Sequence, residues 1–183
     1  MNNAGIFCRS NPDDPTSFDL YRQVMSVNLD ATVKVTLAAV EHLRKSKGSI
    51  VFVSSVASTK ASRMGYAYCM SKSAMSMFAK VLAIDLAPDV RVNIVSPGPV
   101  DTPIFERVGL TNEVVHAIMS VSTLQERIGK SCEIADAIYF LVSDSSSFVH
   151  GHELFIDGGY MLKPAPTSAA EAIIAAKKVA GGE

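Results

Sequence analysis

Two short runs, both rich in β-branched residues, lie on either side of one long helical pattern. The runs occupy residues 49–53 and 90–95. Residues 50–53 are a continuous apolar run, which suits a strand buried on both faces of a parallel sheet, and residues 90–95 are predicted to form a second buried strand. Between them, apolar residues from 66 to 86 recur every three or four positions, as on one face of a helix. Strand, helix and strand in this order predict a right-handed βαβ unit, so an α/β fold is expected.

A second helical pattern precedes the first run and has a polar residue at its centre. It begins after Thr16, the predicted N-cap, and continues to about Lys45. Gly48 is predicted to end this helix. Asn28 lies in the middle. Because asparagine is a poor helix former and its side chain competes for backbone groups, we expect a kink or irregular turn there. The alternative is that Asn28 simply faces solvent.

The remaining elements follow the second run. A helix is predicted over 131–144 and a third strand over 153–157, closed by Gly158 and Gly159. Between them, residues 100–125 have a looser pattern at the carboxyl end of a predicted strand, where α/β folds place ligand contacts. This segment is expected to be a substrate lid, and ordinary packing is the alternative. Its apolar residues are Ile104, Phe105, Val108, Leu110, Val114, Ile118 and Met119.

Composition excludes several classes of function. The net charge is −1 and there is no basic cluster, which argues against nucleic-acid binding. Cys8, Cys69 and Cys132 are far apart, so neither a disulfide framework nor a zinc site is expected. His150 and His152 are interpreted as a turn that enters a strand, because metal sites normally need more ligands. No apolar run is long enough to cross a membrane, and a cytoplasmic location is expected.

The length of 183 residues suits one domain followed by a tail. Pro164 and Pro166 predict a stiff hinge. Residues 168–171 form a capping box that opens an alanine-rich helix. Two alternatives stand for this helix: it packs on a neighbouring subunit, or it frays in solvent.

Tyr68 and Lys72 are four residues apart in the long helix, which places both side chains on one helical face. A phenol, with a pKa of about 10, works as an acid or base near neutral pH when a fixed cation lowers that pKa. Lys72 is a candidate for this cation. The alternative is a surface lysine beside a half-buried tyrosine.

Several motifs occur together in one order. They are Asn2-Asn3-Ala4-Gly5, Asn28, Ser55 thirteen residues before Tyr68, Tyr68 with Lys72, Asn93-x-x-x-Pro97-Gly98-x-x-x-Thr102, and Ile156-Asp157-Gly158-Gly159. In this order they resemble the classical short-chain dehydrogenase/reductase family. The resemblance implies a Rossmann-like parallel sheet with helices on both faces, of which about three strands are present. Residues 1–160 would form the C-terminal catalytic part of one dehydrogenase domain and 161–183 its tail.

The resemblance implies four catalytic residues and an NAD or NADP cofactor. Tyr68 would exchange a proton with a secondary alcohol or ketone. Lys72 would lower the pKa of Tyr68 and bind the nicotinamide ribose. Ser55 would donate a hydrogen bond to the reacting oxygen. Asn28 would hold a water in a proton relay to Lys72.

The same resemblance implies a cofactor site made of two further groups of residues, besides Tyr68 and Lys72. Asn3, Ala4 and Gly5 would line its adenosine side. The nicotinamide carboxamide would be fixed by Pro97, Gly98, Val100 and Thr102. The substrate would be a small alcohol or ketone, and the two long helices and the last strand would form the interfaces of a homo-oligomer, a dimer or tetramer.

One departure from the family pattern is large. The Gly-x-x-x-Gly-x-Gly turn that binds the pyrophosphate is absent. We therefore expect a fragment or a truncated product, in which residues 50–53 expose an apolar edge. One alternative is a catalytically silent relative that serves as an assembly partner. Another is the epimerase and dehydratase branch, which shares the Tyr-x-x-x-Lys pair but fits the Pro97 segment less well.

Overall fold

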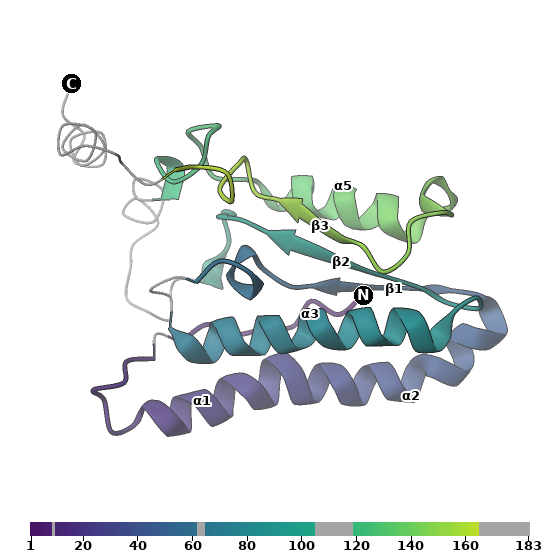
Figure 1. The fold of residues 1–183 in the computed structure, drawn as a ribbon, viewed down its shortest axis with the longest axis horizontal. Coiled ribbons are helices and arrows are strands. Elements are labelled where there is room, and N and C mark those ends of the chain that lie inside the picture. The colour runs from purple at the N-terminus through teal and green to yellow at the C-terminus, as the bar shows by residue number, and fades with distance from the viewer. Residues whose placement is uncertain (9, 62–64, 105–118, 165–183) are drawn as a thin grey trace.

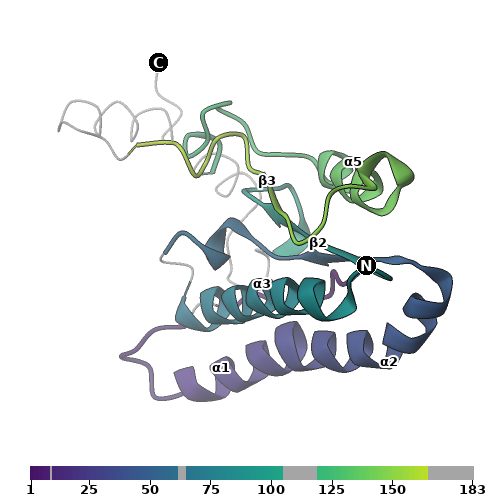
Figure 2. The ribbon, with the colours of Figure 1, turned by 45° about the vertical axis from the view of Figure 1, so that its right-hand side comes forward.

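A three-stranded parallel sheet forms the centre of the computed structural model, which describes residues 1–8, 10–61, 65–104 and 119–164. Its strands, in the order β1-β2-β3, are β1 (Ser49–Val53), β2 (Arg91–Pro97) and β3 (Glu153–Ile156). Helices α1, α2 and α3 lie on one side of the sheet and α5 on the other (Figures 1 and 2). The predicted parallel sheet with helices on both faces is therefore confirmed.

The helices agree with the predicted order of elements. They are α1 (Ser17–Met25), the π-helical turn η1 (Ser26–Asp30), α2 (Ala31–Ser46), the 3-10 turn η2 (Val56–Ser58), α3 (Tyr66–Leu86), α5 (Ser131–Val142) and the 3-10 turn η4 (Asp144–Ser146). β1 and β2 pair in parallel, with Val53 opposite Val95, and α3 connects them. The strand, helix and strand unit expected from the sequence is present.

The core lies between α3 and the sheet. Met75 and Ala79 of α3 pack with Phe52 of β1 and Ile94 of β2, and all four are almost fully buried. On the other face, Ile134 of α5 belongs to a second cluster with side chains of β1 and β2. Because side chains of a strand alternate between faces, β1 and β2 each supply both clusters. This explains why residues 50–53 of β1 are all apolar.

Asn28 lies within the π-helical turn η1, between α1 and α2. Its side chain is fully buried. The irregular turn expected at Asn28 is confirmed, and the alternative of a solvent-facing Asn28 is wrong. π-turns of this kind often occur at functional sites.

Both ends of this helical region differ in detail from the prediction. The Thr16 side chain makes no capping bond; instead Asp14 accepts hydrogen bonds of 2.8 Å from the Thr16 N–H and hydroxyl. At the other end Lys47, not Gly48, adopts the left-handed conformation, with φ of 50°. A Cβ at Gly48 would lie 2.9 Å from Leu43 Cδ2, which is the end of a flexible side chain.

The outer edge of β1 is partly covered by the first residues of the chain. The Asn2 N–H donates to the Val51 carbonyl and the Asn2 carbonyl accepts from the Val53 N–H, both at 2.9 Å. All four side chains of residues 50–53 are buried. The expected exposure of an apolar edge is thus wrong for these side chains, because both faces of β1 are covered and Asn2 pairs with its edge.

The histidine turn has the structural role predicted for it. His150 Nε2 lies 2.7 Å from the Ala83 carbonyl, and its Nδ1 accepts from the Val92 N–H. In the parts of the chain that the structure describes, no cluster of three metal-ligating side chains occurs. The same parts contain no helix that is long and apolar enough to span a membrane. Most of the expected lid, residues 105–118, and the tail from 165 lie outside the described residues.

Removal of a central ring tests the core. Phe52→Ala is expected to lower the free energy of unfolding by about 3–5 kcal/mol, because it leaves a cavity between β1 and α3. Urea unfolding monitored by circular dichroism measures this change. Val35→Ala, at an exposed position of α2, is the control and should change stability by less than about 0.5 kcal/mol. Equal losses for both variants would contradict the assignment of the core.

Candidate active site

Ser55 lies just beyond the carboxyl end of β1, where the chain leaves the sheet. The Ser54 N–H still bonds the Val95 carbonyl of β2, and Ser55 then caps the short turn η2. Its Oγ accepts a 3.1 Å hydrogen bond from the Ala57 N–H. Ser55 is buried, and its hydrogen bond with Ala57 fixes its side chain just beyond the carboxyl end of β1.

Tyr68 projects from the first turns of α3 toward Ser55. The two side chains are hydrogen-bonded, and Phe7 packs edge-on against the Tyr68 ring at 5.4 Å between centroids. Burial raises the pKa of Tyr68 to about 12, although the Ser55 hydrogen bond lowers it. Lys72 was expected to lower this pKa below its ordinary value. The pKa of Tyr68 is raised instead, because burial removes more of the stabilisation of the phenolate by water than the Ser55 hydrogen bond replaces.

Lys72 is buried on the same face of α3. Its Nζ donates a 2.8 Å hydrogen bond to the Val53 carbonyl and lies 5.8 Å from the centre of the Tyr68 ring. Burial lowers the pKa of Lys72 from its usual 10.5 to about 8. The predicted shared face is confirmed, and the alternative of a surface lysine is wrong.

Asn28 joins the N-terminal segment to α3. Its Oδ1 accepts from the Ile6 N–H at 2.8 Å, and its Nδ2 donates to the Ile6 carbonyl and to Ser71 Oγ, both at 3.0 Å. Ser71 Oγ in turn donates to the Tyr68 carbonyl at 2.8 Å. The Asn28 side chain therefore has protein partners at both polar atoms, and its expected binding of a relay water stays a prediction.

Gly5 passes directly beside Lys72. A Cβ at Gly5 would lie 3.6 Å from Lys72 Nζ and 3.5 Å from Asn28 Oδ1. Asn3, Ala4 and Gly5 are exposed. A bare backbone next to a buried ammonium leaves room for a ligand rich in hydrogen-bond acceptors, so these residues fit the cofactor that the sequence motifs imply.

The second predicted group for the cofactor lies at the carboxyl end of β2. Gly98 follows Pro97 and lies against the main chain just after β3. A Cβ at Gly98 would lie 2.8 Å from Asp157 Cα. Val100 forms an isolated bridge with Gly129, and the Thr102 hydroxyl lies 3.5 Å from the Val100 carbonyl. The structure thus places this group on the same edge of the sheet as Ser55.

Apolar side chains surround the Tyr68 ring. Phe7, Ala57 and Tyr68 form one buried cluster, against which Cys69, Ile104 and Met119 pack. Ile104 and Met119 belong to the expected lid and lie on either side of residues 105–118, which the structure does not describe. Packing of these two residues against the cluster that contains Tyr68 is consistent with either role predicted for this segment.

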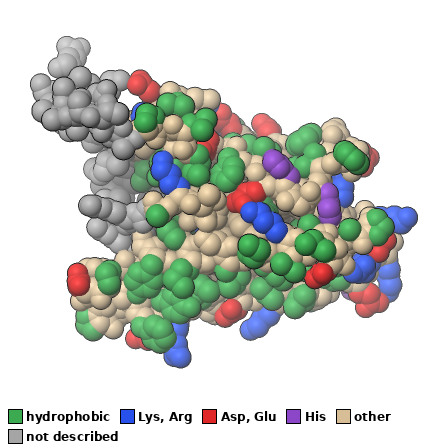
Figure 3. Space-filling model, in the orientation of Figure 1, with side chains coloured by type: hydrophobic (Ala, Val, Ile, Leu, Met, Phe, Trp, Pro, Cys, Tyr) green, Lys and Arg blue, Asp and Glu red, His purple; other side chains and the backbone are tan. Residues whose placement is uncertain are grey.

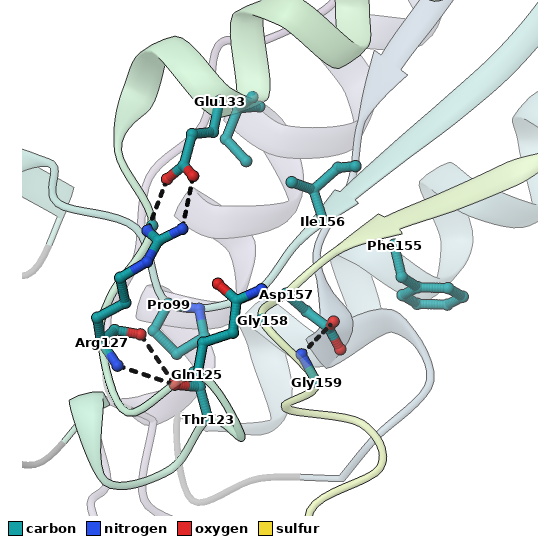
Figure 4. Close-up of a pocket in the computed structure, with 12 residues that line it drawn as sticks. Pro99, Thr123, Gln125, Arg127, Glu133, Phe155, Ile156, Asp157, Gly158 and Gly159 are labelled. Atoms are coloured by element: carbon teal, nitrogen blue, oxygen red, sulfur yellow. Dashed lines mark hydrogen bonds and ion pairs between the residues drawn. The ribbon is translucent and has the colours of Figure 1, made fainter.

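A separate pocket of about 350 Å³ lies between the end of β3 and the start of α5 (Figure 4). Arg127 points into it, but both of its terminal nitrogens bind Glu133, at 2.9 and 2.7 Å. Asp157 accepts from the Gly159 and Met161 N–H groups. The lining includes none of the four predicted catalytic residues, so this pocket is distinct from the Tyr68 site.

Three residues that contribute to this region were missed in the sequence. Phe7 and Ser71 contact the ring and the carbonyl of Tyr68, and nothing in their local sequence marks them. Glu153 is nearly buried in β3 and accepts hydrogen bonds from three serines. A carboxylate inside an otherwise apolar strand was a usable signal, because such a group needs partners.

Comparison with known proteins identifies the family. A family model described as Enoyl-(Acyl carrier protein) reductase matches residues 1–161. The chain belongs to the short-chain dehydrogenase/reductase family. The motif positions described above, including Tyr68 and Lys72, lie within the matched range.

Similar members of the short-chain dehydrogenase/reductase family include one curated relative and two solved structures. Cyclopentanol dehydrogenase of Comamonas sp. is 39% identical over 162 residues, which cover 87% of this chain and 64% of that protein. The ligand-free aldohexose dehydrogenase of Thermoplasma acidophilum has 31% identity and a TM-score of 0.84, with 91% and 69% of the chains covered. A Burkholderia cenocepacia gluconate 5-dehydrogenase, in complex with NADP and tartrate, has 29% identity, a TM-score of 0.80 and coverage of 89% and 64%.

The buried ionisable pair makes stability depend on pH. Between about pH 8 and 10.5 the unfolded chain binds the Lys72 proton more tightly than the folded one, so the free energy of unfolding should rise with pH. The lowered pKa corresponds to roughly 3 kcal/mol over the full window. Above about pH 10 the raised pKa of Tyr68 has the opposite effect, since the unfolded tyrosine ionises first.

Urea unfolding at about pH 7.5 and 9.5, below the tyrosine window, tests this dependence. The rise should be present in the wild type and in Lys34→Met, which removes an exposed lysine. It should be absent in Lys72→Met. An equal rise in all three proteins would contradict the assignment to Lys72.

Proposed function

We propose that this chain carries the catalytic part of an NAD(P)-dependent oxidoreductase that interconverts a secondary alcohol and a ketone. The observation that carries the proposal is the meeting of Ser55, Tyr68 and Lys72 at the carboxyl edge of the sheet. These residues come from β1's end and from α3. Their contact supports acid and base chemistry at one point.

Tyr68 is the proton donor and acceptor of this proposal. Its phenol is hydrogen-bonded to Ser55, so a substrate oxygen that reaches both hydroxyls is oriented and polarised there. The apolar side chains around the ring exclude water from the reacting group. A neutral phenol, favoured by the raised pKa, is the form that protonates a carbonyl oxygen during reduction.

Lys72 and the Gly5 backbone are the proposed seat of the nicotinamide ribose. The ammonium already has one partner, the Val53 carbonyl, and can donate two more hydrogen bonds. Asn3 and Ala4 continue this surface, and Pro97, Gly98, Val100 and Thr102 provide the other side. The nicotinamide group, when bound, accepts or supplies the hydride. Asn28 positions the segment on which Gly5 lies.

The choice between NAD and NADP stays open in this proposal. The gluconate 5-dehydrogenase structure contains NADP, which supports use of this class of cofactor. The cyclopentanol relative supports a small alcohol as substrate. This chain spans 64% of that relative, so activity of the 183-residue chain by itself belongs to the proposal as well.

A second proposed function is assembly with copies of the same chain. Exposed apolar side chains gather over α1 and α3, as Figure 3 shows for one face. They include Phe18, Met70, Met77, Val81 and Ile84. On the other side of the sheet, Tyr139 and Phe140 of α5 are also exposed. Patches of this kind support a homo-oligomer, in which a silent chain serves only as an assembly partner.

Cofactor binding separates the two functions. Isothermal titration of the chain with NAD and with NADP should show binding of at least one of them. Gly5→Val should weaken that binding by about tenfold or more, because its side chain occupies the space beside Lys72 Nζ. Leu37→Val, at an exposed position of α2, is the control and should bind as the wild type does. Absence of binding for both dinucleotides would refute an enzyme made of this chain alone.

Replacement of the proposed acid tests the chemistry. Tyr68→Phe should reduce hydride transfer between cyclopentanol and the bound dinucleotide by roughly 100-fold or more, measured by the absorbance of the reduced nicotinamide. Tyr139→Phe changes an exposed tyrosine and should keep the rate. Circular dichroism should be the same for all three proteins. A Tyr68→Phe rate near that of the wild type would exclude Tyr68 as the acid or base.

A further inference from the structure

We propose that Glu153 is a positioning residue, which fixes the three segments that carry Ser55, Lys72 and Pro97 relative to one another. The inference rests on the proposed function, because it concerns the same site. Glu153 lies on β3, between 57 and 95 residues after the serines it contacts. Its side chain is 9% exposed.

One carboxylate oxygen of Glu153 contacts three serines from three elements. Oε1 lies 3.0 Å from Ser58 Oγ of η2, 3.2 Å from Ser76 Oγ of α3 and 2.7 Å from Ser96 Oγ of β2. The other oxygen, Oε2, forms a 2.8 Å ion pair with Lys80 of α3. A carboxylate only accepts hydrogen bonds, so the three serine hydroxyls act as donors toward Oε1, and Ser58 shares its single proton between Oε1 and the Ser55 carbonyl.

Each serine is linked to a segment of the site, Ser58 by one hydrogen bond, Ser76 through Ser54, and Ser96 through the chain itself. The Ser58 hydroxyl lies 2.7 Å from the Ser55 carbonyl. The Ser76 hydroxyl lies 2.8 Å from Ser54 Oγ, which in turn lies 3.2 Å from the Lys72 carbonyl. Ser96 directly precedes Pro97 and Gly98. Glu153 therefore reaches the turn that carries Ser55, the helix that carries Lys72 and the proposed nicotinamide segment.

The hydrogen-bond partners of Glu153 stabilise its negative charge. Burial by itself would raise the pKa of this carboxyl group, but hydrogen bonds from Lys80, Ser96 and Ser58 together lower it. The group is therefore ionised near neutral pH. A buried charge with several donors holds them in a narrow geometry, because any displacement leaves the charge without a partner.

Two substitutions distinguish the contacts of Glu153 with the serines from its ion pair with Lys80. Glu153→Gln removes the charge from the three serines. Lys80→Met removes the ion pair but leaves the carboxylate and its serine contacts. Only the first variant should disturb the site, whereas a purely structural ion pair predicts equal effects.

The first readout needs no activity. In a protein with ¹³C-labelled tyrosine rings, the Tyr68 resonance is assigned by its loss in Tyr68→Phe. Glu153→Gln should shift or broaden this resonance, because the Ser55 to Tyr68 hydrogen bond no longer has one geometry. Lys80→Met should leave it unchanged. An unchanged resonance in a folded Glu153→Gln protein would overturn the proposal, as would the same shift in Lys80→Met.

The second readout is the rate of hydride transfer. Glu153→Gln should lower kcat by roughly tenfold, with KM changed by less than about twofold, because the substrate still binds but its reacting groups are misaligned. Glu153→Asp, which keeps the charge, should recover part of kcat. A kcat equal to that of the wild type in Glu153→Gln would overturn the proposal. If the wild-type chain itself transfers no hydride, the proposed function fails and the tyrosine resonance alone decides on Glu153.

A smaller change covers the case in which Glu153→Gln does not fold. Ser58→Ala removes only the link between Glu153 and the Ser55 turn. It should shift the Tyr68 resonance while the other tyrosine resonances stay in place. An unchanged Tyr68 resonance in Ser58→Ala would then overturn the proposal.

Discussion

Packing of α3 against the parallel sheet is the constraint on which the rest of the structure depends. Its apolar residues cover β1 and β2, and polar side chains enter this contact only with partners. Lys72 is the clearest case, because its buried ammonium bonds the Val53 carbonyl at the end of β1. Within the described residues, no buried side-chain nitrogen or oxygen lacks a hydrogen-bond partner. This contact therefore sets both the stability of the core and the position of the site.

The site is assembled from segments that are far apart in the sequence. Asn28 in the π-turn binds the backbone of Ile6, and Ser71 relays this contact to the first turn of α3. Glu153, from the last strand, connects the turn after Ser55 with α3 and β2. Each link replaces hydration that burial removes, so the polar residues of the site are also the ones that align its elements. Chemistry and packing use the same side chains here.

Much of the fold was predictable because its signals are local. The apolar runs and the spacing in residues 66–86 predicted two parallel strands and a helix, and all are present. The poor helix propensity of Asn28 predicted the irregular turn. The left-handed residue at the end of α2 was not predictable, because it is Lys47, and a lysine carries no local signal for a positive φ. Pairing of Asn2 with β1 is a contact across about fifty residues, which no local pattern indicates.

By itself the sequence determined the order of elements, the shared helical face of Tyr68 and Lys72, and the family motifs that include Ser55 and Asn28. The first two follow from periodicity and spacing, which are local, and the motifs follow from the resemblance to the family. Only the tertiary structure decided the electrostatics of the site. Burial raises the pKa of Tyr68 and lowers that of Lys72, and the assembly of η2, α3 and β2 around β3 brings three serines to Glu153. Desolvation depends on every element that packs around a group, so it is a property of the assembled fold.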